Sequence, residues 1–498
     1  MAPVPTEVIY DASHSATKND GDQQPATSSS QKRYKKCVVV GFGMVGIAFV
    51  EKLLKYDLEG GRDEWQVTVI GEEPHLAYNR VGLSTYWEKT SVEELYLNPL
   101  EWYSSHAPGK LTYHTSDQVL GIDSNSKLIK TQKGHEISYD ICVLATGSDA
   151  ALPPYVSRQK FESIQGAFVY RNISDLEEML AYSKTRQIKR AAVVGGGLLG
   201  LEAAKALLDL ETVEQAIIVE RNQWVLSRQL DALGGRMVLE KVRNLGVEVL
   251  LQARVRDLIL EPSQESEKQR LTGIMLQGAQ DGSTPDTPYD LDMIVFAVGI
   301  KARDELAKPS SIITDPRGGF VVDHHLRTNI PDVYAIGECA SYKGETWGLI
   351  APGVEMADTL SWNLTEGPHH QIRTMTPPDV STKLKLMGVD VASFGDFFAD
   401  QGKISKPLPG TTRKGNESNS IPIEKQVKSM TYRDPFSDVY KKYIFTADGK
   451  YLIGGMMVGD VKDFVKLVGI CSKQKLIEKP PAEFIVGAKK KEKKKEMI

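Results

Sequence analysis

Two glycine-rich hexapeptides have residue types and spacing that suit the binding of a phosphate group. In a G-x-G-x-x-G pattern, the first glycine permits a tight turn, the second lets backbone N–H groups approach a pyrophosphate, and the third lets a helix pack closely on a strand. The glycines at these positions are Gly41, Gly43 and Gly46 in the first hexapeptide and Gly195, Gly197 and Gly200 in the second. Two such patterns in one chain predict two dinucleotide sites.

Each hexapeptide lies between an apolar run and a helical stretch. The first joins Cys37–Val40 to Ile47–Lys55, and the second joins Ala191–Val194 to Leu201–Leu208. A phosphate bound at such a turn lies at the positive end of the helix. Because short β-branched runs alternate with helical stretches along the chain, the predicted fold class is α/β with parallel sheets.

A carboxylate follows the second strand of each unit, where it could accept hydrogen bonds from both hydroxyls of an adenosine ribose. After Val67–Ile70 the candidates are Glu72 and Glu73, and we favour Glu73 because it directly precedes a Pro-His-Leu-Ala-Tyr stretch. After Ala216–Val219 the candidate is Glu220. Its distance from the last glycine is close to the expected spacing of about 20 residues.

The cysteines are not spaced for a redox or metal centre. No C-x-x-C pair occurs, which argues against a zinc knuckle, a redox dithiol and a four-thiolate iron–sulfur site. The four cysteines are Cys37, Cys142, Cys339 and Cys471. We expect reduced intracellular thiols, with Cys339 a buried apolar residue rather than a redox thiol. Without thiols or metals to carry electrons, two dinucleotides point to FAD plus NAD(P)H.

Three further strand ends support a chain that binds FAD plus NAD(P)H. One run closes on Thr146 and Gly147, and Met293–Gly299 ends in a similar glycine turn. A later strand ends in Gly337 and Glu338. The Glu338 carboxylate could accept a hydrogen bond from the ribityl chain of a flavin.

Length and composition describe a soluble multidomain protein. At 498 residues the chain allows about three domains, and 41% hydrophobic with 25% charged residues is typical of globular protein. A net charge of -4 gives no basic face that favours nucleic acid. The sequence has neither an apolar run of about 18 residues nor the apolar segment of a signal peptide. We therefore expect no membrane partner and a cytoplasmic location.

Several longer stretches carry a resemblance to a known family. They read GEEPHLAYNRVGLS (71–84), GGGLLGLEAA (195–204), VGIKARDELA (298–307), GECA (337–340) and STKLKLMGVDVASFGDFFAD (381–400). With these stretches the chain resembles the two-dinucleotide pyridine nucleotide-disulfide oxidoreductase-like superfamily. Within it, the chain is most similar to the flavin and NAD(P)H half of fungal-type assimilatory nitrite reductase.

The resemblance implies two Rossmann-like three-layer dinucleotide-binding domains plus a C-terminal α+β domain, which often covers the flavin and can make a homodimer contact. The implied domains are a discontinuous FAD-binding domain (36–155 and 293–366), an NAD(P)H-binding domain (156–292) and the C-terminal domain (367–487). From composition alone we also expect a disordered leader (1–35), a long loop (401–426) and a Lys-rich tail (488–498).

The resemblance also assigns residues to the two cofactors. Those implied for FAD are Gly41, Gly43, Gly46, Glu73, Arg80, Thr146, Gly147, Gly337 and Glu338. Those implied for NAD(P)H are Gly195, Gly197, Gly200, Glu220 and Gly299, with Glu202 near the nicotinamide end. Arg80 would stabilise negative charge on the pyrophosphate or the reduced flavin; a surface salt bridge is its other interpretation.

The implied activity is an FAD-dependent NAD(P)H oxidoreductase. Hydride passes from NAD(P)H to flavin N5 without a catalytic side chain, and electrons continue to a small-molecule or protein acceptor. Complete nitrite reductases continue into iron–sulfur and sirohaem domains with clustered cysteines, so we do not expect a complete nitrite reductase here. The alternative is an apoptosis-inducing-factor-like NADH-binding flavoprotein with a mainly signalling or scaffold role.

Two further predictions concern the preference for NADH over NADPH and the possibility of a metal site. Glu220 favours NADH, because a 2′-phosphate would meet a like charge, whereas the neighbouring Arg221 could accept that phosphate. The pairs His324-His325 and His369-His370 suggest a metal, but adjacent histidines on a strand point to opposite faces and no third ligand is near in sequence. We therefore expect no metal site.

Overall fold

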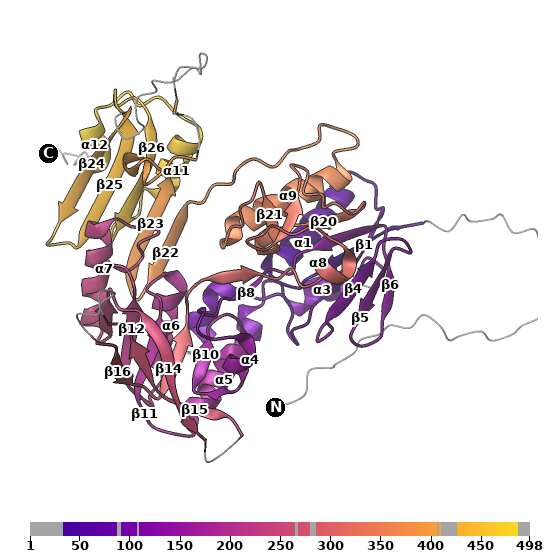
Figure 1. The fold of residues 1–498 in the computed structure, drawn as a ribbon. Helices are drawn as coiled ribbons and strands as arrows, with labels where there is room; N and C mark the ends of the chain where they lie inside the picture. The colour runs from indigo at the N-terminus through magenta and orange to yellow at the C-terminus, as the bar shows by residue number, and fades with distance from the viewer. Residues whose placement is uncertain are drawn as a thin grey trace, which may run out of the picture. The chain divides into compact units, whose positions relative to one another are not determined.

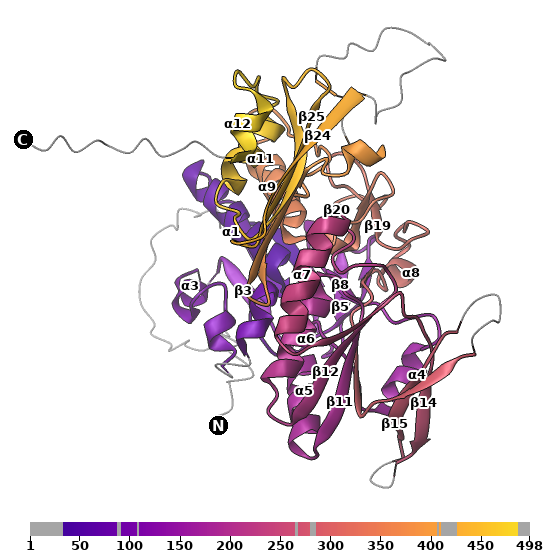
Figure 2. The same cartoon turned by 90° about the vertical axis from the view of Figure 1, so that its left-hand side faces the viewer.

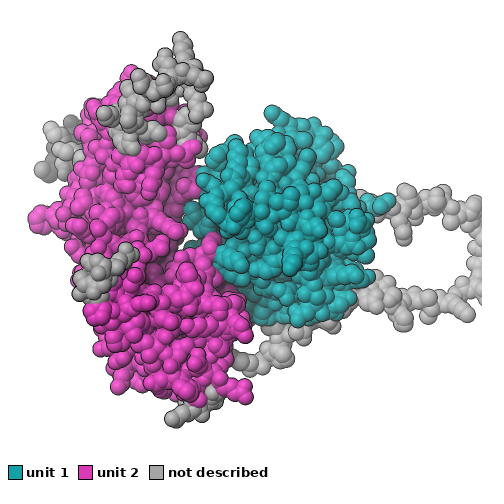
Figure 3. All heavy atoms as spheres, in the orientation of Figure 1, with its two compact units in different colours: residues 1–82, 90–149, 301–378 teal, residues 83–89, 150–300, 379–498 magenta. Residues whose placement is uncertain are grey.

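The computed structural model describes residues 33–86, 91–106, 109–263, 267–278, 285–405, 408–409 and 426–486. Most of the predicted leader, most of the loop 401–426 and the whole Lys-rich tail lie outside these ranges. The chain forms two compact units (Figure 3): unit 1 comprises residues 1–82, 90–149 and 301–378, and unit 2 comprises residues 83–89, 150–300 and 379–498. The division into three domains stays a prediction.

Unit 1 is built on a five-stranded parallel sheet with the order β20-β7-β1-β2-β3. Figure 1 labels two of its strands, β1 and β20. Its strands are β20 (Val333–Ala335), β7 (Ile141–Leu144), β1 (Lys35–Val40), β2 (Trp65–Ile70) and β3 (Leu111–His114). Helices α1 (Met44–Glu59) and α9 (Ile350–Thr365) pack together, and the Ser361 hydroxyl donates to the Phe49 carbonyl oxygen at 3.1 Å. The last four residues of β1 are buried, as the continuous apolar run predicts.

Smaller elements complete unit 1. An antiparallel sheet not singled out in the sequence has the order β4-β5-β6. The bounds are β4 (Val119–Asp123), β5 (Leu128–Thr131), β6 (Glu136–Ser138), β19 (Phe320–Val322), β21 (Ala340–Tyr342), α3 (Leu100–Ser105), α8 (Ala307–Ser310) and the 3-10 helix η3 (Gly337–Cys339). The short strands β4 to β6 are hard to predict because their apolar residues do not form long runs.

The first part of unit 2 holds a second five-stranded parallel sheet, with the order β10-β17-β11-β12-β13. Its strands are β10 (Ala167–Val169), β17 (Met293–Phe296), β11 (Ile188–Val194), β12 (Val213–Glu220) and β13 (Glu248–Leu251). The principal helices are α5 (Ile173–Lys184), α6 (Leu198–Asp209) and α7 (Ala232–Asn244), and Figure 2 shows them with the sheet. Both sheets are parallel, so the α/β prediction is confirmed.

The Pro- and Gly-rich stretch 262–288 contributes to a second, antiparallel sheet in this part of unit 2. Strands β14 (Val255–Pro262), β15 (Gln269–Leu276) and β16 (Thr287–Asp290) form an antiparallel sheet, while residues 264–266 and 279–284 lie outside the described ranges. A register shift at Thr272 interrupts the alternation of β15, and Leu271 and Ile274 on either side of it both lie in the core.

The C-terminal part of unit 2 is an antiparallel sheet with the order β22-β23-β26-β25-β24. The bounds are β22 (Thr382–Leu386), β23 (Val389–Gly395), β24 (Val427–Asp434), β25 (Val439–Thr446), β26 (Leu452–Val458), α11 (Phe464–Ser472) and α12 (Pro481–Val486). Buried residues such as Phe394, Tyr443 and Leu467 form its core. Among the described residues, no helix has the length and apolar character needed to cross a membrane.

Candidate functional site

In the first glycine turn, two glycines are required by close packing. Gly41 has a φ of +118°, which side-chain-bearing residues rarely adopt, and a Cβ there would lie well under 3.0 Å from the Ala145 carbonyl oxygen. A Cβ at Gly46 would similarly collide with the Gly41 carbonyl oxygen. Gly43 differs, because it caps α1 in an extended conformation and no atom lies within 4 Å of its ideal Cβ position. The space beside Gly43 therefore suits a ligand.

The second turn repeats this arrangement. Gly195 has a φ of +115°, and a Cβ there would collide with the Ala297 carbonyl oxygen. A Cβ at Gly200 would collide with the Gly195 carbonyl oxygen, whereas Gly197 caps α6 and again has nothing within 4 Å of its Cβ position. Each unit thus has one helix N-terminus with an open backbone approach, which fits the pyrophosphate of a dinucleotide.

Distant segments of unit 1 converge on the first turn. A Cβ at Gly337 would lie 3.2 Å from a Val45 methyl carbon, and one at Gly353 would lie 2.5 Å from the other methyl carbon of Val45. The first turns of α1 and α9 are therefore in contact with η3. Helix α9 begins at Ile350, and no side chain caps its N-terminus. Its positive end can face an anionic group.

The predicted polar residues at the ends of β7 and β20 lie in the same unit. The Ser148 hydroxyl donates to the Glu338 carboxylate at 2.6 Å. The Thr146 hydroxyl donates to the Arg303 carbonyl oxygen at 2.6 Å, and the Arg303 N–H donates to the Gly147 carbonyl oxygen at 3.0 Å. Thr146, Gly147 and Glu338 are thus assembled around the carboxyl ends of neighbouring parallel strands, where ligands of α/β sheets bind.

Both acids after β2 have arginine partners. Arg80, in the 3-10 helix η1 (Arg80–Thr85), forms an ion pair with Glu73, and the Tyr78 hydroxyl donates to the same carboxylate at 2.8 Å. The Arg80 and Glu73 side chains are only 24% and 23% exposed, so the pair is more protected than a surface salt bridge.

Arg303 is a residue that sequence reasoning missed. Its guanidinium donates to Glu72, with one contact of 2.5 Å, and lies 3.5 Å from Asp149. It links the end of β2 to the segment after β7. A lone arginine 231 residues from its partner gives no local signal, although it lies within the stretch 298–307 that carries the family resemblance.

In unit 2, the Glu220 carboxylate is hydrogen-bonded to the backbone of the second glycine turn. Glu220 is the last residue of β12 and is buried, and its carboxylate accepts the Gly196 N–H at 2.6 Å and the Asn222 N–H at 2.7 Å. Arg221 is exposed. Gly299 follows β17, and nothing lies within 4 Å of its ideal Cβ position. The acid and the open glycines therefore lie at the same edge of the sheet.

Glu202 lies in α6, two residues after Gly200, and is half-buried. Burial raises the pKa of its carboxyl from 4.5 to about 7, because the charged form loses water. This group therefore changes its charge near neutral pH.

The cysteine prediction agrees with the structure. All four cysteines are free, and Cys37, Cys142 and Cys339 are buried. Burial raises the pKa of these three thiols, which keeps them in the unreactive protonated form. The chain's thiols are therefore poor candidates for carrying electrons.

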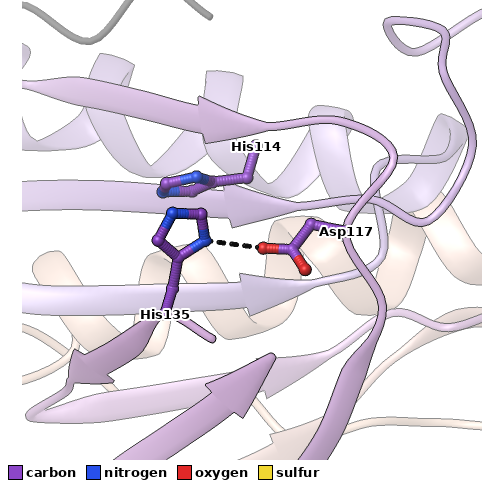
Figure 4. Close-up of side chains that lie close together, drawn as sticks. All are labelled: His114, Asp117 and His135. Atoms are coloured by element: carbon purple, nitrogen blue, oxygen red, sulfur yellow. Dashed lines mark hydrogen bonds and ion pairs between the residues drawn. The ribbon is translucent and has the colours of Figure 1, made fainter. Parts of the chain in front are cut away.

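The pair His324-His325 does not lie on a strand, contrary to the prediction. The two residues occupy a turn, and their ring centroids are 4.1 Å apart. Within the described ranges, the structure instead brings together His114, Asp117 and His135, whose ligand atoms all lie within 4.8 Å of one another (Figure 4). The sequence spacing of these three residues matches no common metal motif.

The chain is similar to known proteins over most of its length. The profile of the pyridine nucleotide-disulphide oxidoreductase family matches residues 35–357. The chain is 48% identical over 485 residues to a nitrite reductase [NAD(P)H] of Emericella nidulans, covering 97% of this chain and 42% of that protein. It is 49% identical over 467 residues to the Neurospora crassa nitrite reductase [NAD(P)H], covering 91% of this chain and 38% of that protein. The chain thus spans about two fifths of these relatives.

Solved structures share the fold. The covalent putidaredoxin reductase–putidaredoxin complex matches with a TM-score of 0.68 at 18% identity, covering 89% of this chain and 94% of that chain. The NADH:rubredoxin oxidoreductase of Clostridium acetobutylicum matches with a TM-score of 0.61 at 22% identity, covering 90% of this chain and 97% of that chain.

Proposed function

Because the chain belongs to the pyridine nucleotide-disulphide oxidoreductase family, we propose that it takes electrons from NADH and passes them to a separate protein. Family membership makes it an oxidoreductase with FAD and NAD(P)H as cofactors, as the sequence predicted. When bound, FAD accepts a hydride from NAD(P)H and releases electrons to the next carrier. The observation that carries the proposal is the pair of open N-cap glycines, Gly43 and Gly197.

The residues of unit 1 would bind FAD through its phosphates, ribose and polar chain. The turn at Gly41–Gly46 would present N–H groups to the pyrophosphate, and Glu73 would accept from the adenosine ribose. Glu338 would accept from the ribityl chain, in exchange for or in addition to its bond from Ser148. Arg80 would keep its ion pair with Glu73 or turn toward the phosphates, and either position balances negative charge in the site.

The residues of unit 2 would bind the nicotinamide nucleotide and select NADH. The backbone bonds to Glu220 hold its carboxylate at the end of β12. A 2′-phosphate there would meet a fixed negative charge. Arg221, exposed beside it, could offset part of that repulsion, so we propose preference for NADH rather than exclusion of NADPH. Glu202 would lie near the nicotinamide end.

The proposed acceptor is a protein with an iron–sulfur or iron centre. The chain's own thiols are buried or half-buried and free, so a thiol relay within the chain is disfavoured. Similar proteins include an enzyme named NADH-rubredoxin oxidoreductase and a reductase solved with putidaredoxin. The signalling alternative has no comparable support. A cytoplasmic location remains part of this proposal.

The test combines spectroscopy with two matched valine variants. Purified protein should show flavin absorption that bleaches on anaerobic titration with NADH, at lower concentrations than with NADPH. Gly43→Val should fold but lose FAD, because its side chain fills the open approach to the phosphates. Gly197→Val should keep FAD and need at least about tenfold more NADH for half-reduction. Gly469→Val, at an open glycine of α11, is the control and should change neither.

Specific outcomes would overturn the proposal. A colourless protein that binds no added FAD would refute the flavin function, and undiminished FAD in Gly43→Val would refute the first site. Acceptor choice is measured separately, by comparing NADH-dependent reduction of a purified rubredoxin and a [2Fe–2S] ferredoxin with reduction of dioxygen. Faster turnover with dioxygen than with either protein would contradict a protein acceptor.

A further inference from the structure

We propose that His114 and His135, with Asp117 orienting the His135 ring, form a binding site for a divalent transition-metal ion of the Zn²⁺ type. His114 is the last residue of β3, Asp117 lies in the loop that follows, and His135 lies in the turn between β5 and β6. The three residues come together in unit 1, with ligand atoms within 4.8 Å (Figure 4). None of them is a residue proposed to bind FAD or NAD(P)H.

Asp117 fixes the orientation of one imidazole. Its side chain is completely buried, and its carboxylate contacts His135 Nδ1 at 2.8 Å and accepts the Lys133 N–H at 3.0 Å. A carboxylate at Nδ1 favours the tautomer with hydrogen on that nitrogen, which leaves the Nε2 lone pair available. Metal-bound histidines commonly have this carboxylate partner on the other ring nitrogen.

His114 supplies the second imidazole. Its ring centroid lies 4.8 Å from that of His135, with 47° between the ring planes, and Figure 4 shows the two rings against each other. Its strand is anchored, because the His114 carbonyl oxygen accepts the Gly71 N–H at 2.8 Å. The His135 side chain is 33% exposed, so water can complete the coordination of an ion.

The chemistry of the ligands selects the class of metal. Neutral imidazole nitrogens suit Zn²⁺, Cu²⁺ and Ni²⁺, whereas Mg²⁺ and Ca²⁺ prefer sites made of oxygen atoms. Two nitrogens on a tetrahedral Zn²⁺ lie about 3.4 Å apart when each bond is about 2.1 Å. Small rotations of the two partly exposed rings provide the required approach, while the buried Asp117 stays in place.

A purely structural role explains only part of this arrangement. The Asp117 bonds to His135 and to the Lys133 N–H close the turn that leads into β6. That role does not need a second imidazole against His135. The same loop also donates from Ser116 N–H to the Glu73 carbonyl oxygen and from Asp117 N–H to the Gly71 carbonyl oxygen, both at 2.9 Å. The metal would thus lie beside the segment proposed to contact the FAD ribose.

The test measures Zn²⁺ affinity in the untagged, FAD-loaded protein by competition with a chromophoric chelator. We expect about one Zn²⁺ per chain and at least about tenfold weaker binding in His114→Gln and in His135→Gln. The control is the double variant His324→Gln/His325→Gln, which removes another close imidazole pair and should bind Zn²⁺ like the wild type. Bound Cu²⁺ should show nitrogen hyperfine splitting in its EPR spectrum, and this splitting should decrease in each single variant.

The outcomes separate this proposal from the flavin function. Absence of stoichiometric Zn²⁺ binding would overturn it. Unchanged affinity in both single variants, or equal weakening in the control, would also overturn it, because adventitious surface binding would then explain the data. FAD content and circular dichroism of each variant are measured in parallel. If His135→Gln unfolds, His114→Gln decides the question, because its side chain does not make the buried bond to Asp117.

Discussion

The glycines of the two turns have two different physical roles at the level of single residues. Gly41 and Gly46 leave no room for a Cβ, whereas Gly43 faces open space in a backbone conformation that any residue adopts. A substitution therefore acts on stability at the first two positions and on cofactor binding at the third. In the second turn, Gly195 and Gly200 likewise leave no room for a Cβ, whereas Gly197 faces open space.

At Gly46, we expect alanine to destabilise the fold. A Cβ would collide with the Gly41 carbonyl oxygen, so Gly46→Ala should lower the free energy of unfolding by roughly 3 kcal/mol. Gly43→Ala should lower it by only about 1 kcal/mol, because alanine is a poorer N-cap than glycine. Urea denaturation of the FAD-free proteins measures both values. Equal effects of the two substitutions would contradict the division of roles.

Glu202 makes stability depend on pH near neutrality. Folding raises the pKa of the Glu202 carboxyl from 4.5 to about 7. In the pH window between these two values, the folded chain therefore binds more protons than the unfolded chain. The free energy of unfolding therefore falls as pH rises through the window. Gln has no charge to bury, so the Tm of Glu202→Gln relative to wild type should increase from about pH 5 to about pH 8. A difference in Tm that is constant with pH would show that Glu202 keeps its ordinary pKa.

Among the elements, helix α7 is joined to the C-terminal sheet through its N-cap. Asp231 accepts the Gly234 N–H at 3.1 Å and the Tyr440 hydroxyl at 2.6 Å. Lys442 lies 3.3 Å from Asp231 and 2.7 Å from Asp400, and its side chain is only 9% exposed. One carboxylate thus caps a helix of the dinucleotide-binding part and contacts strand β25.

Removing this carboxylate should cost more than the loss of a helix cap. Asp231→Ala leaves the buried Lys442 with one partner, so we expect a loss of roughly 3 kcal/mol in the free energy of unfolding. Ser157→Ala, which removes only the cap of the short helix α4 (Arg158–Glu162), should cost about 1 kcal/mol. Adding Lys442→Met to Asp231→Ala should recover part of the loss. No recovery would indicate that Lys442 does not depend on Asp231.

On the scale of the whole molecule, the two proposed cofactor sites belong to different compact units. Unit 1 has a core that includes Val39, Phe49 and Leu144, and unit 2 has separate cores in its dinucleotide-binding and C-terminal parts. Binding to one unit stabilises that unit first, because a ligand shifts only the unfolding equilibria of the structure it contacts.

Removal of FAD should therefore loosen unit 1 selectively. FAD at about a thousand times its Kd contributes about 4 kcal/mol, so its loss should accelerate hydrogen exchange in residues 41–46, 145–149 and 337–353. Exchange in the sheet formed by β11 and β12 should change little. Mass spectrometry of the FAD-loaded and FAD-free proteins measures both regions. Equal loss of protection in the two sheets would contradict independent stabilisation.

The cofactors, the α/β class and the two glycine turns are predictable from the sequence, because a strand, a turn and a helix are consecutive in the chain and carry a local pattern. Gly41, Gly43 and Gly46 could be assigned separate roles before any coordinates were known, and those packing roles agree with the structure. The resemblance to the flavin half of nitrite reductase rested on similarly continuous stretches, and it is confirmed.

The contacts between distant segments are seen in the tertiary structure and were not predicted from the sequence. The structure paired Arg303 with Glu72 across 231 residues, placed His135 against His114, and attached Lys442 to Asp231. None of these pairs has a fixed spacing, because each depends on how loops close and on which sheet edges meet. Local patterns specify local backbone geometry, whereas side-chain partners far apart in sequence are set by packing of the whole unit.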